Sequence, residues 1–324
     1  MPIEWYPGHM VTARKEAALA MRKTDVVLEV LDARVPFSSC NPLVESLRRE
    51  NQRPALKILN KADIADPERT RQWLAYYDAQ PGVQAIALSA KQAAAVKRIP
   101  DRALALAPHR ATPGKPLRLM ILGIPNVGKS TLMNTLLKRT VTKVGDAPAV
   151  TKHHLGHELG RNMWLVDTPG MLWPGVEARA AIKLAATHSI GPNAYDVVEV
   201  AADLGQYLLA EYPQLLQQRF PAIQAGANGY EIIDGVAQSR SLLIKGGAPD
   251  RERAARVLLG DFRAGTLGRM SLETPEQVAE RQLRPPPSAR PPSAHAEPEQ
   301  TESEASGSEP PESEPSELSG TGEE

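Results

Sequence analysis

The chain has 324 residues, and its 38 Lys and Arg residues balance its 38 Asp and Glu residues. The charge is uneven: residues 1–175 hold 25 basic and 15 acidic residues, whereas residues 284–324 hold ten Glu and two Arg. No apolar run approaches the roughly 18 residues that cross a bilayer, and no signal peptide is recognised, so a cytoplasmic protein without a membrane span is expected. The single cysteine, Cys40, excludes an internal disulfide and fits a reducing compartment.

Short apolar runs alternate with helical patterns over the first 175 residues. Continuously apolar runs predict buried strands at residues 26–31, 55–59, 83–88, 117–122 and 163–166. Helical periodicity predicts helices at residues 10–23, 67–78, 92–106 and 130–138. This alternation indicates the α/β class, with a mostly parallel sheet that carries helices on both faces.

The strand signals fade beyond residue 175. Helical patterns follow at residues 178–186, 195–211 and 251–262, so residues 176–283 are predicted to form a small all-helical domain. Residues 284–324 are rich in Pro, Ser and Glu and have almost no large apolar side chain, which predicts a disordered acidic tail. The expected organisation is therefore an α/β domain at 1–175, a helical domain at 176–283 and the tail.

A phosphate-binding loop is predicted at residues 123–130, which read GIPNVGKS and match G-x-x-x-x-G-K-[ST]. The backbone N–H groups of such a loop cradle phosphates, while Lys129 reaches the β and γ oxygens and the Ser130 hydroxyl reaches Mg²⁺. The predicted nucleotide-binding residues here are Asn126, Val127, Gly128, Lys129, Ser130 and Thr131. The alternative, a glycine-rich turn without a ligand, is disfavoured by the strand before the loop and the helix after it.

The tetrapeptide DTPG at residues 167–170 ends the last predicted strand. Asp167 is expected at the carboxyl end of that strand, where it can hold Mg²⁺ through a water molecule. Gly170 is suited to bring a backbone N–H group close to a γ-phosphate. Taken alone, Asp167 could merely cap a turn; together with the loop at 123–130 it reads as the Walker B acid of a nucleotide site.

Two motifs at successive strand ends predict which base is bound. Asn60, Lys61 and Asp63 belong to the sequence NKAD, and Ser89, Ala90 and Lys91 form the sequence SAK. A carboxylate accepts hydrogen bonds from both N1–H and the exocyclic amine of guanine, whereas adenine offers an acceptor at N1 that would repel it. The pair of motifs therefore predicts GTP rather than ATP.

The order of these motifs is unusual. In Ras-type GTPases the phosphate motifs precede NKxD and SAK, but here the base motifs come first. A circular permutation, in which the old termini are joined and the chain opens elsewhere, gives this order while it keeps the site intact in space. The fold expected for residues 1–175 is thus a circularly permuted Ras-like P-loop domain, whose DTPG strand leads directly into the helical domain.

These motifs together resemble the circularly permuted ribosome-assembly GTPases, most closely the ribosome biogenesis GTPase A family of bacteria. The resemblance also rests on WYPGHM at 5–10, DARVP at 32–36, MLWP at 171–174 and the segments RAA at 253–255 and DFRAGTLGRMSLE at 261–273. It implies a cytoplasmic GTPase for late maturation of the large (50S) ribosomal subunit, with GTP, GDP and Mg²⁺ as ligands. It also implies the large-subunit precursor and its rRNA as partners, slow intrinsic hydrolysis that the particle stimulates, and a monomer off the ribosome.

The resemblance assigns roles to three further residues. Met171 stands where Ras-type enzymes have a water-orienting Gln, and the family gives that task to the histidine that is His9 here; a purely structural His9 is the alternative. Asn126 is implied as a ligand of K⁺ next to the phosphates; an Asn126 that only supports the turn is the alternative. Thr151 is implied as the switch threonine on Mg²⁺, although Ala149 replaces the usual glycine of this segment.

Two functions of different classes are therefore considered. The first is a GTP-hydrolysing switch that binds the immature large subunit with GTP and leaves after hydrolysis. The alternative is a non-enzymatic rRNA-binding scaffold whose affinity is tuned by guanine nucleotide. The complete set of phosphate, Mg²⁺ and base motifs favours the enzyme.

Overall fold

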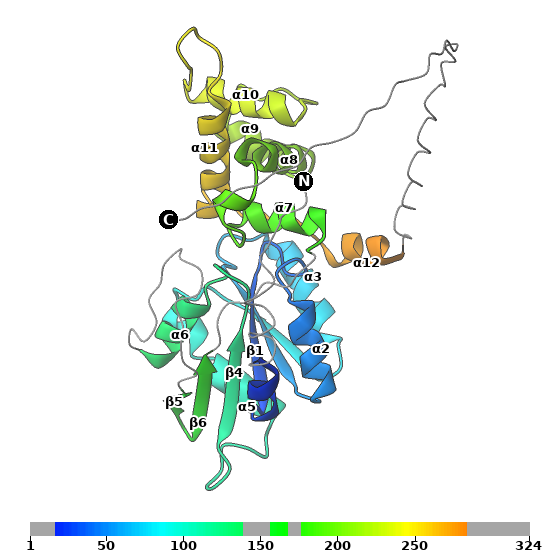
Figure 1. Cartoon of the computed structure of the whole chain (residues 1–324), viewed down its shortest axis with the longest axis vertical. Coiled ribbons are helices and arrows are strands. Elements are labelled where there is room, and N and C mark those ends of the chain that lie inside the picture. The colour runs from blue at the N-terminus through cyan, green and yellow to red at the C-terminus, as the bar shows by residue number, and fades with distance from the viewer. Residues whose placement is uncertain (1–16, 139–155, 168–175, 284–324) are drawn as a thin grey trace, which may run out of the picture. The chain divides into compact units, whose positions relative to one another are not determined.

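The structure, a computed structural model, describes residues 17–138, 156–167 and 176–283. Its centre is a six-stranded sheet in the order β3-β2-β1-β4-β6-β5, in which every neighbouring pair is parallel except β5 and β6 (Figure 1). The strands are β1 (Val26–Asp32), β2 (Ala55–Asn60), β3 (Val83–Ala87), β4 (Leu117–Leu122), β5 (Gly156–Gly160) and β6 (Met163–Asp167).

Helices cover both faces of the sheet. They are α2 (Pro42–Glu50), α3 (Pro67–Asp78), α4 (Ala93–Val96), α5 (Ile99–Leu106) and α6 (Lys129–Leu137), together with a helical turn at residues 17–22. Because side chains alternate along a strand, Val27 and Met120 pack on the side of α2, whereas Leu28 and Ile121 pack on the side of α5 and α6. Burial on both faces explains why these strands are continuously apolar in sequence.

The strand order reverses between β1 and β4. From β1 the chain proceeds outward to β2 and β3, and it then returns to place β4 on the other side of β1. In open α/β sheets, ligands bind at the carboxyl ends of the strands where the order reverses. The base motifs follow β2 and β3 and the phosphate loop follows β4, so both groups of motifs lie at this edge.

The residues beyond the sheet are mainly helical. Their helices are α7 (Ala178–Ala186), the 3-10 turn η1 (Pro192–Ala194), α8 (Val197–Glu211), α9 (Pro213–Arg219), α10 (Gly229–Ser239), α11 (Arg251–Ala264) and α12 (Pro275–Leu283). Helices α8, α10 and α11 pack against one another, and α7 packs on α8. Helix α12 returns to the α/β part, where Val278 packs with Trp73 of α3. No helix within the described ranges is long and apolar enough to span a membrane.

The mostly parallel sheet, its helical cover and the helical region confirm the predicted fold class, but the prediction of single elements was incomplete. The expected helix at 92–106 is two helices, because Pro100 lies at the start of α5 and cannot donate a backbone N–H inside a longer helix. Strand β5 was missed since its sequence, GHELG, is polar, and the individual helices α2, α9, α10 and α12 were also missed. The boundary at 175 stays a prediction, and residues 10–16 and the tail lie outside the described residues.

A buried charged pair lies between β1 and β2. The ammonium of Lys57 donates to a carboxylate oxygen of Glu29, and both side chains are 1% exposed. Lys57 also lies 3.2 Å from the Sγ atom of Cys40. Burial and the neighbouring Glu29 raise the pKa of the Cys40 thiol to about 12, which disfavours its thiolate form.

Glu273 joins the helical region to the α/β part. Its carboxylate accepts hydrogen bonds from the backbone N–H and the hydroxyl of Ser38, at 2.9 and 2.8 Å. The ammonium of Lys183, on α7, lies 3.0 Å from the same carboxylate, and the two side chains are 1% and 10% exposed. The indole N–H of Trp73 donates to the carbonyl of Glu273 at 3.0 Å.

Glu273→Gln is expected to lower the free energy of unfolding by about 3 kcal/mol, because it removes the buried negative charge that pairs with Lys183 and accepts hydrogen bonds from Ser38. Urea unfolding followed by circular dichroism measures the change. Glu252→Gln is the matched control, since Glu252 forms an exposed ion pair with Arg256 on α11 and should change stability little. Equal effects of the two substitutions would contradict the role given to Glu273.

Candidate nucleotide site

The phosphate loop connects β4 to α6 in a conformation that requires its second glycine. Gly128 is the N-cap of α6 and has a φ angle of 97°, in the left-handed region that side chains rarely adopt. A Cβ atom at Gly128 would also lie 2.3 Å from Nδ2 of Asn60. Both the backbone angle and the close approach of Asn60 therefore exclude a side chain at this position.

Asn60 is the link between three loops at the edge of the sheet. It ends β2 and is 2% exposed. Its Nδ2 atom donates to the carbonyl of Val127 in the phosphate loop at 2.7 Å, and its Oδ1 atom accepts from the backbone N–H of Ala90 in SAK at 2.8 Å. The base motifs and the phosphate loop are thus held together by one buried amide.

Lys61 makes a second connection between the base motif and the phosphate loop. Its ammonium donates to the carbonyl of Asn126 at 2.8 Å and forms an ion pair with Asp32, at the end of β1, at 2.9 Å. A φ angle of 61° at Lys61 turns the chain sharply after β2. The side chain of Asp63, two residues later, is exposed to solvent.

The SAK segment lies against the start of NKAD and against α6. Ser89 and Ala90 are buried, whereas Lys91 is exposed. The backbone N–H of Ala62 donates to the carbonyl of Leu88 at 3.1 Å, and the hydroxyl of Thr135 on α6 donates to the carbonyl of Ala90 at 2.8 Å. The structure therefore brings both base motifs and the phosphate loop to one place, while their binding roles stay predictions.

The ammonium of Lys61 is held in place by a buried carboxylate, that of Asp32. Asp32 is fully buried and pairs with the guanidinium of Arg34 through bonds of 2.9 and 2.7 Å. Burial by itself would raise the pKa of Asp32, but Arg34 and Lys61 outweigh it and hold that pKa well below its ordinary value. Burial lowers the pKa of Lys61, and the carboxylate of Asp32 opposes this change.

This lowered pKa predicts acid sensitivity. A carboxyl whose pKa is lower in the folded than in the unfolded protein stabilises the fold above its unfolded pKa, about 4, and this contribution is lost as the pH falls. The free energy of unfolding should therefore fall as the pH drops below about 4. Asp32→Asn should make that pH dependence shallower, as measured by urea unfolding between pH 6 and pH 3; an unchanged slope would contradict the assignment to Asp32.

The candidate Mg²⁺ ligands come from adjacent strand ends. Ser130 lies in the first turn of α6, and Asp167 ends β6 with its backbone opposite Ile121 of β4. A hydroxyl and a carboxylate are oxygen donors of the kind Mg²⁺ prefers, so the two residue types suit the ion, and their binding of Mg²⁺ stays a prediction. Within the described residues, no group of three His, Cys, Asp or Glu forms a metal site. Three predicted residues, His9, Thr151 and Gly170, lie outside the described residues.

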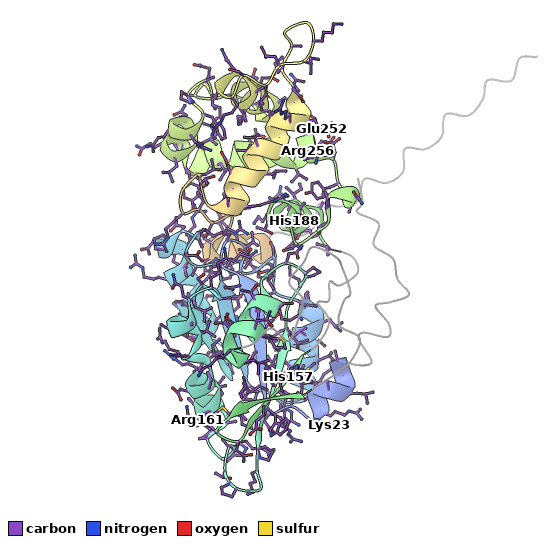
Figure 2. The ribbon with its side chains drawn as sticks, turned by 90° about the vertical axis from the view of Figure 1, so that its left-hand side faces the viewer. Lys23, His157, Arg161, His188, Glu252 and Arg256 are labelled. Atoms are coloured by element: carbon purple, nitrogen blue, oxygen red, sulfur yellow. The ribbon has the colours of Figure 1, made fainter. Side chains whose placement is uncertain are left out.

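The phosphate loop also contacts the helical region. The Nδ2 atom of Asn126 donates to the carbonyl of His188 at 2.8 Å. His188 follows α7 with a φ angle of 68°, and Figure 2 labels it. This bond orients the amide of Asn126, whose oxygen Oδ1 is the atom that could bind a cation.

Comparisons with known proteins agree with this architecture. A family model described as "50S ribosome-binding GTPase" matches residues 118–219, which begin in β4, downstream of the base motifs. The ribosome biogenesis GTPase A of Bacillus cereus is 35% identical over 289 residues, which cover 87% of this chain and 97% of the relative. The chain belongs to the ribosome biogenesis GTPase A family. The family member of Thermotoga maritima is 30% identical over 86% of this chain and 97% of its own length.

Solved structures of this family share the fold. A GDP-bound structure of TM YlqF has a TM-score of 0.61 and 25% identity over 81% of this chain and 99% of its own. A GNP-bound structure of YlqF from T. maritima has a TM-score of 0.58 and 26% identity over 82% and 99%. As a member of this GTPase family the chain binds guanine nucleotide and hydrolyses GTP.

Sequence reasoning missed two neighbours of the predicted site. Arg34 holds Asp32 against Lys61, and the carbonyl of His188 holds Asn126. Asp32 and Arg34 belong to the motif DARVP at 32–36, which was noted as part of the family resemblance but was given no role. No pattern in the sequence could have paired Asn126 with a residue 62 positions later.

Proposed function

We propose that the protein is a GTP-dependent assembly factor for late maturation of the large ribosomal subunit, and that GTP binding and hydrolysis switch its affinity for the subunit precursor. The observation that carries the proposal is the meeting of NKAD, SAK and the phosphate loop through Asn60 and Lys61, in a chain that matches family members over most of its length. The relatives are named for ribosome biogenesis. A cytoplasmic location, where ribosomal particles are found, is part of the proposal.

The base-side residues receive the following roles. The exposed carboxylate of Asp63 accepts from N1–H and the exocyclic amine of guanine. Lys61 is assigned a place along the nucleotide between NKAD and the phosphate loop, held there by Asp32. The SAK segment covers the base on the side away from Asp63, through Ala90. The side chain of Asn60 fixes Ala90 by accepting a hydrogen bond from its backbone N–H.

The phosphate-side residues act electrostatically. The backbone of residues 126–131 at the start of α6 offers N–H groups to the phosphates, and Lys129 neutralises their charge. Ser130, Asp167 and Thr151 would hold Mg²⁺, which when bound supplies charge neutralisation at the β and γ oxygens. The backbone of Gly170 is assigned to the γ-phosphate.

A potassium ion is proposed beside the phosphates, with Oδ1 of Asn126 as one ligand. The contact with His188 supports this assignment because it orients the amide. The cation would serve in place of an arginine finger. Rates of GTP hydrolysis measured in K⁺ and in Na⁺ at equal ionic strength test the assignment.

The surface of α11 is less basic than its sequence suggests. Arg251 forms an ion pair with Asp234 at 2.7 Å, and Arg256 forms one with Glu252 at 2.6 Å, a pair that Figure 2 labels. An rRNA contact on α11 would exchange these carboxylates for phosphates, so its affinity should depend strongly on salt.

Co-sedimentation with ribosomal particles tests the proposal directly. The protein is mixed with large-subunit precursors, mature large subunits and small subunits, each with GTP, GDP, a non-hydrolysable GTP analogue or ATP. The proposal predicts retention on the large-subunit precursor with the GTP analogue and release with GDP. Equal retention in all nucleotides would contradict the switch and favour a scaffold, and retention on the small subunit alone would contradict the assignment to the large subunit.

His9→Ala is expected to keep GDP affinity but to lose most of the hydrolysis that the particle stimulates, about 100-fold, because no imidazole then orients the attacking water. Single-turnover hydrolysis on the particle measures the rate, and equilibrium GDP binding is the internal control. Unchanged stimulated turnover would remove His9 from the mechanism.

A further inference from the structure

The loop that carries Asp63 is clasped by a distant part of the chain. Residues 265–273, which follow α11 and which we term the strap, run along residues 60–66, which we term the base loop. In the strap, Nε of Arg269 donates to the carbonyl of Ala65 and Nη2 donates to the carbonyl of Ala62, both at 3.0 Å. One guanidinium therefore bridges the two ends of the turn that contains Asp63.

Neighbouring residues of the strap continue these contacts. The backbone N–H of Met270 donates to the carbonyl of Ile64 at 3.2 Å, and the hydroxyl of Ser271 accepts from the backbone N–H of Asp66 at 3.1 Å. Together with Arg269, these residues engage the backbone on both sides of Asp63. The strap thus fixes the path of the base loop through hydrogen bonds to its backbone, although the two segments do not pair as β-strands.

The start of the strap leaves no room for a shift of the base loop towards α11. Gly265 ends α11 with a φ angle of 76°, and a Cβ atom there would lie 2.4 Å from Cγ2 of Ile64. The base loop is therefore packed against the strap as well as hydrogen-bonded to it.

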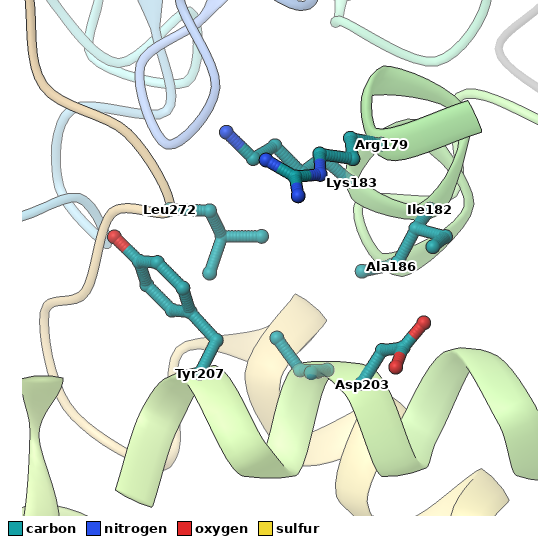
Figure 3. Close-up of a pocket in the computed structure, with 8 residues that line it drawn as sticks. Arg179, Ile182, Lys183, Ala186, Asp203, Tyr207 and Leu272 are labelled. Atoms are coloured by element: carbon teal, nitrogen blue, oxygen red, sulfur yellow. The ribbon is translucent and has the colours of Figure 1, made fainter. Parts of the chain in front are cut away.

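The other side of the strap is anchored in the helical region. Leu272, Tyr207 of α8 and Lys183 of α7 line a pocket of about 290 Å³. Figure 3 shows how these side chains lie around it. Next to Leu272, Glu273 holds the ammonium of Lys183. The strap consequently connects the base loop to α7 and α8.

We propose that Arg269 is a positioning residue for guanine recognition, which holds the base loop so that the carboxylate of Asp63 meets both hydrogen-bond donors of the base. The proposal rests on the role given to Asp63 under the proposed function. The side chain of Asp63 is exposed, so the path of its backbone decides where its carboxylate stands. The two hydrogen bonds from guanine to the carboxylate of Asp63 form together only when the carboxylate is accurately placed. If the loop could move by about an ångström, one bond would form and the other would be lost.

The strap also makes base recognition sensitive to the helical region. A partner that displaces α7 or α8 would move the strap and thereby change the affinity for guanine nucleotide. By thermodynamic linkage, guanine nucleotide would change the affinity for that partner by the same factor.

The test compares two nucleotides on the same protein. Dissociation constants for GDP and for IDP, whose base lacks the exocyclic amine, are measured by competition with a fluorescent GDP derivative. The phosphates of both ligands are identical, so the ratio of the two constants reports only the contacts of the base. Because it is a ratio on one sample, partial loss of folded protein cancels.

Arg269→Ala should reduce the preference for GDP over IDP by about tenfold, and Arg269→Lys, which offers one ammonium in place of a fork, should reduce it less. Arg263→Ala is the matched control: Arg263 also donates to two carbonyls, those of Ala185 and Ala186 at 2.8 and 2.9 Å, but inside the helical region. It should leave the ratio unchanged.

Asp63→Ala separates failure of the inference from failure of its premise. This variant should abolish the preference for GDP over IDP. If it does so while Arg269→Ala keeps the wild-type ratio, or while Arg263→Ala lowers the ratio equally, the role of Arg269 is overturned and that of Asp63 stands. If Asp63→Ala keeps the wild-type preference, both roles are overturned.

Discussion

Asp63→Asn is expected to weaken GDP binding roughly a thousandfold and to create tight binding of XDP. The amide presents an N–H donor to the exocyclic amine of guanine, so one charge-assisted hydrogen bond is lost and two donors face each other. Xanthine has a carbonyl at that position and retains N1–H, so it matches the amide with one bond in each direction. Isothermal titration with GDP and XDP measures both constants.

Asp101→Asn is the control for this experiment. Asp101 is an exposed carboxylate, paired with Arg161 at 2.6 Å, on α5. Its substitution should leave both affinities unchanged. Equal losses for GDP and XDP in Asp63→Asn would show that the carboxylate does not read the base.

Asn60→Ala is expected to lower the free energy of unfolding by about 3 kcal/mol and GDP affinity by about a hundredfold. The truncation leaves the carbonyl of Val127 and the N–H of Ala90 without the amide that satisfies both in a buried position. It also frees the phosphate loop from the base motifs, so nucleotide binding must then order both. Chemical denaturation and titration with GDP measure the two effects.

Asn51→Ala provides the comparison. The Nδ2 atom of Asn51 donates to the carbonyl of Leu47 at 2.8 Å at the end of α2, outside the candidate site. This variant should lose a little stability and no affinity. A loss of stability without a loss of affinity in Asn60→Ala would mean that Asn60 supports the fold alone.

The sequence was most informative where one physical rule determines the pattern. Burial on both faces of a parallel sheet makes strands such as β1 and β4 continuously apolar, so they could be predicted within a residue or two. Strand β5 escaped because it alternates exposed and half-buried residues at the edge of the sheet. The break between α4 and α5 follows from Pro100, which lies in the first turn of α5. The prediction of one helix at 92–106 relied on periodicity and gave this proline too little weight.

The candidate site was predictable to the extent that its motifs are local. NKAD, SAK and GIPNVGKS each encode a loop of fixed chemistry, and strand order placed them at one edge. The contacts that fix these loops are not local: the bonds from Arg269 reach back 204 and 207 residues to the base loop. Such pairs arise only from the folded path of the chain, and neither spacing nor periodicity reports them.

Hydrolysis of GTP in the presence of ribosomal particles tests the central claim most directly. The rate is measured for the protein alone and with purified large-subunit precursors, with mature large subunits and ATP as comparisons. A guanine-specific assembly switch predicts slow hydrolysis alone, clear stimulation by the precursor and no turnover of ATP. Hydrolysis that the precursor leaves unchanged, or that proceeds equally with ATP, would contradict the account.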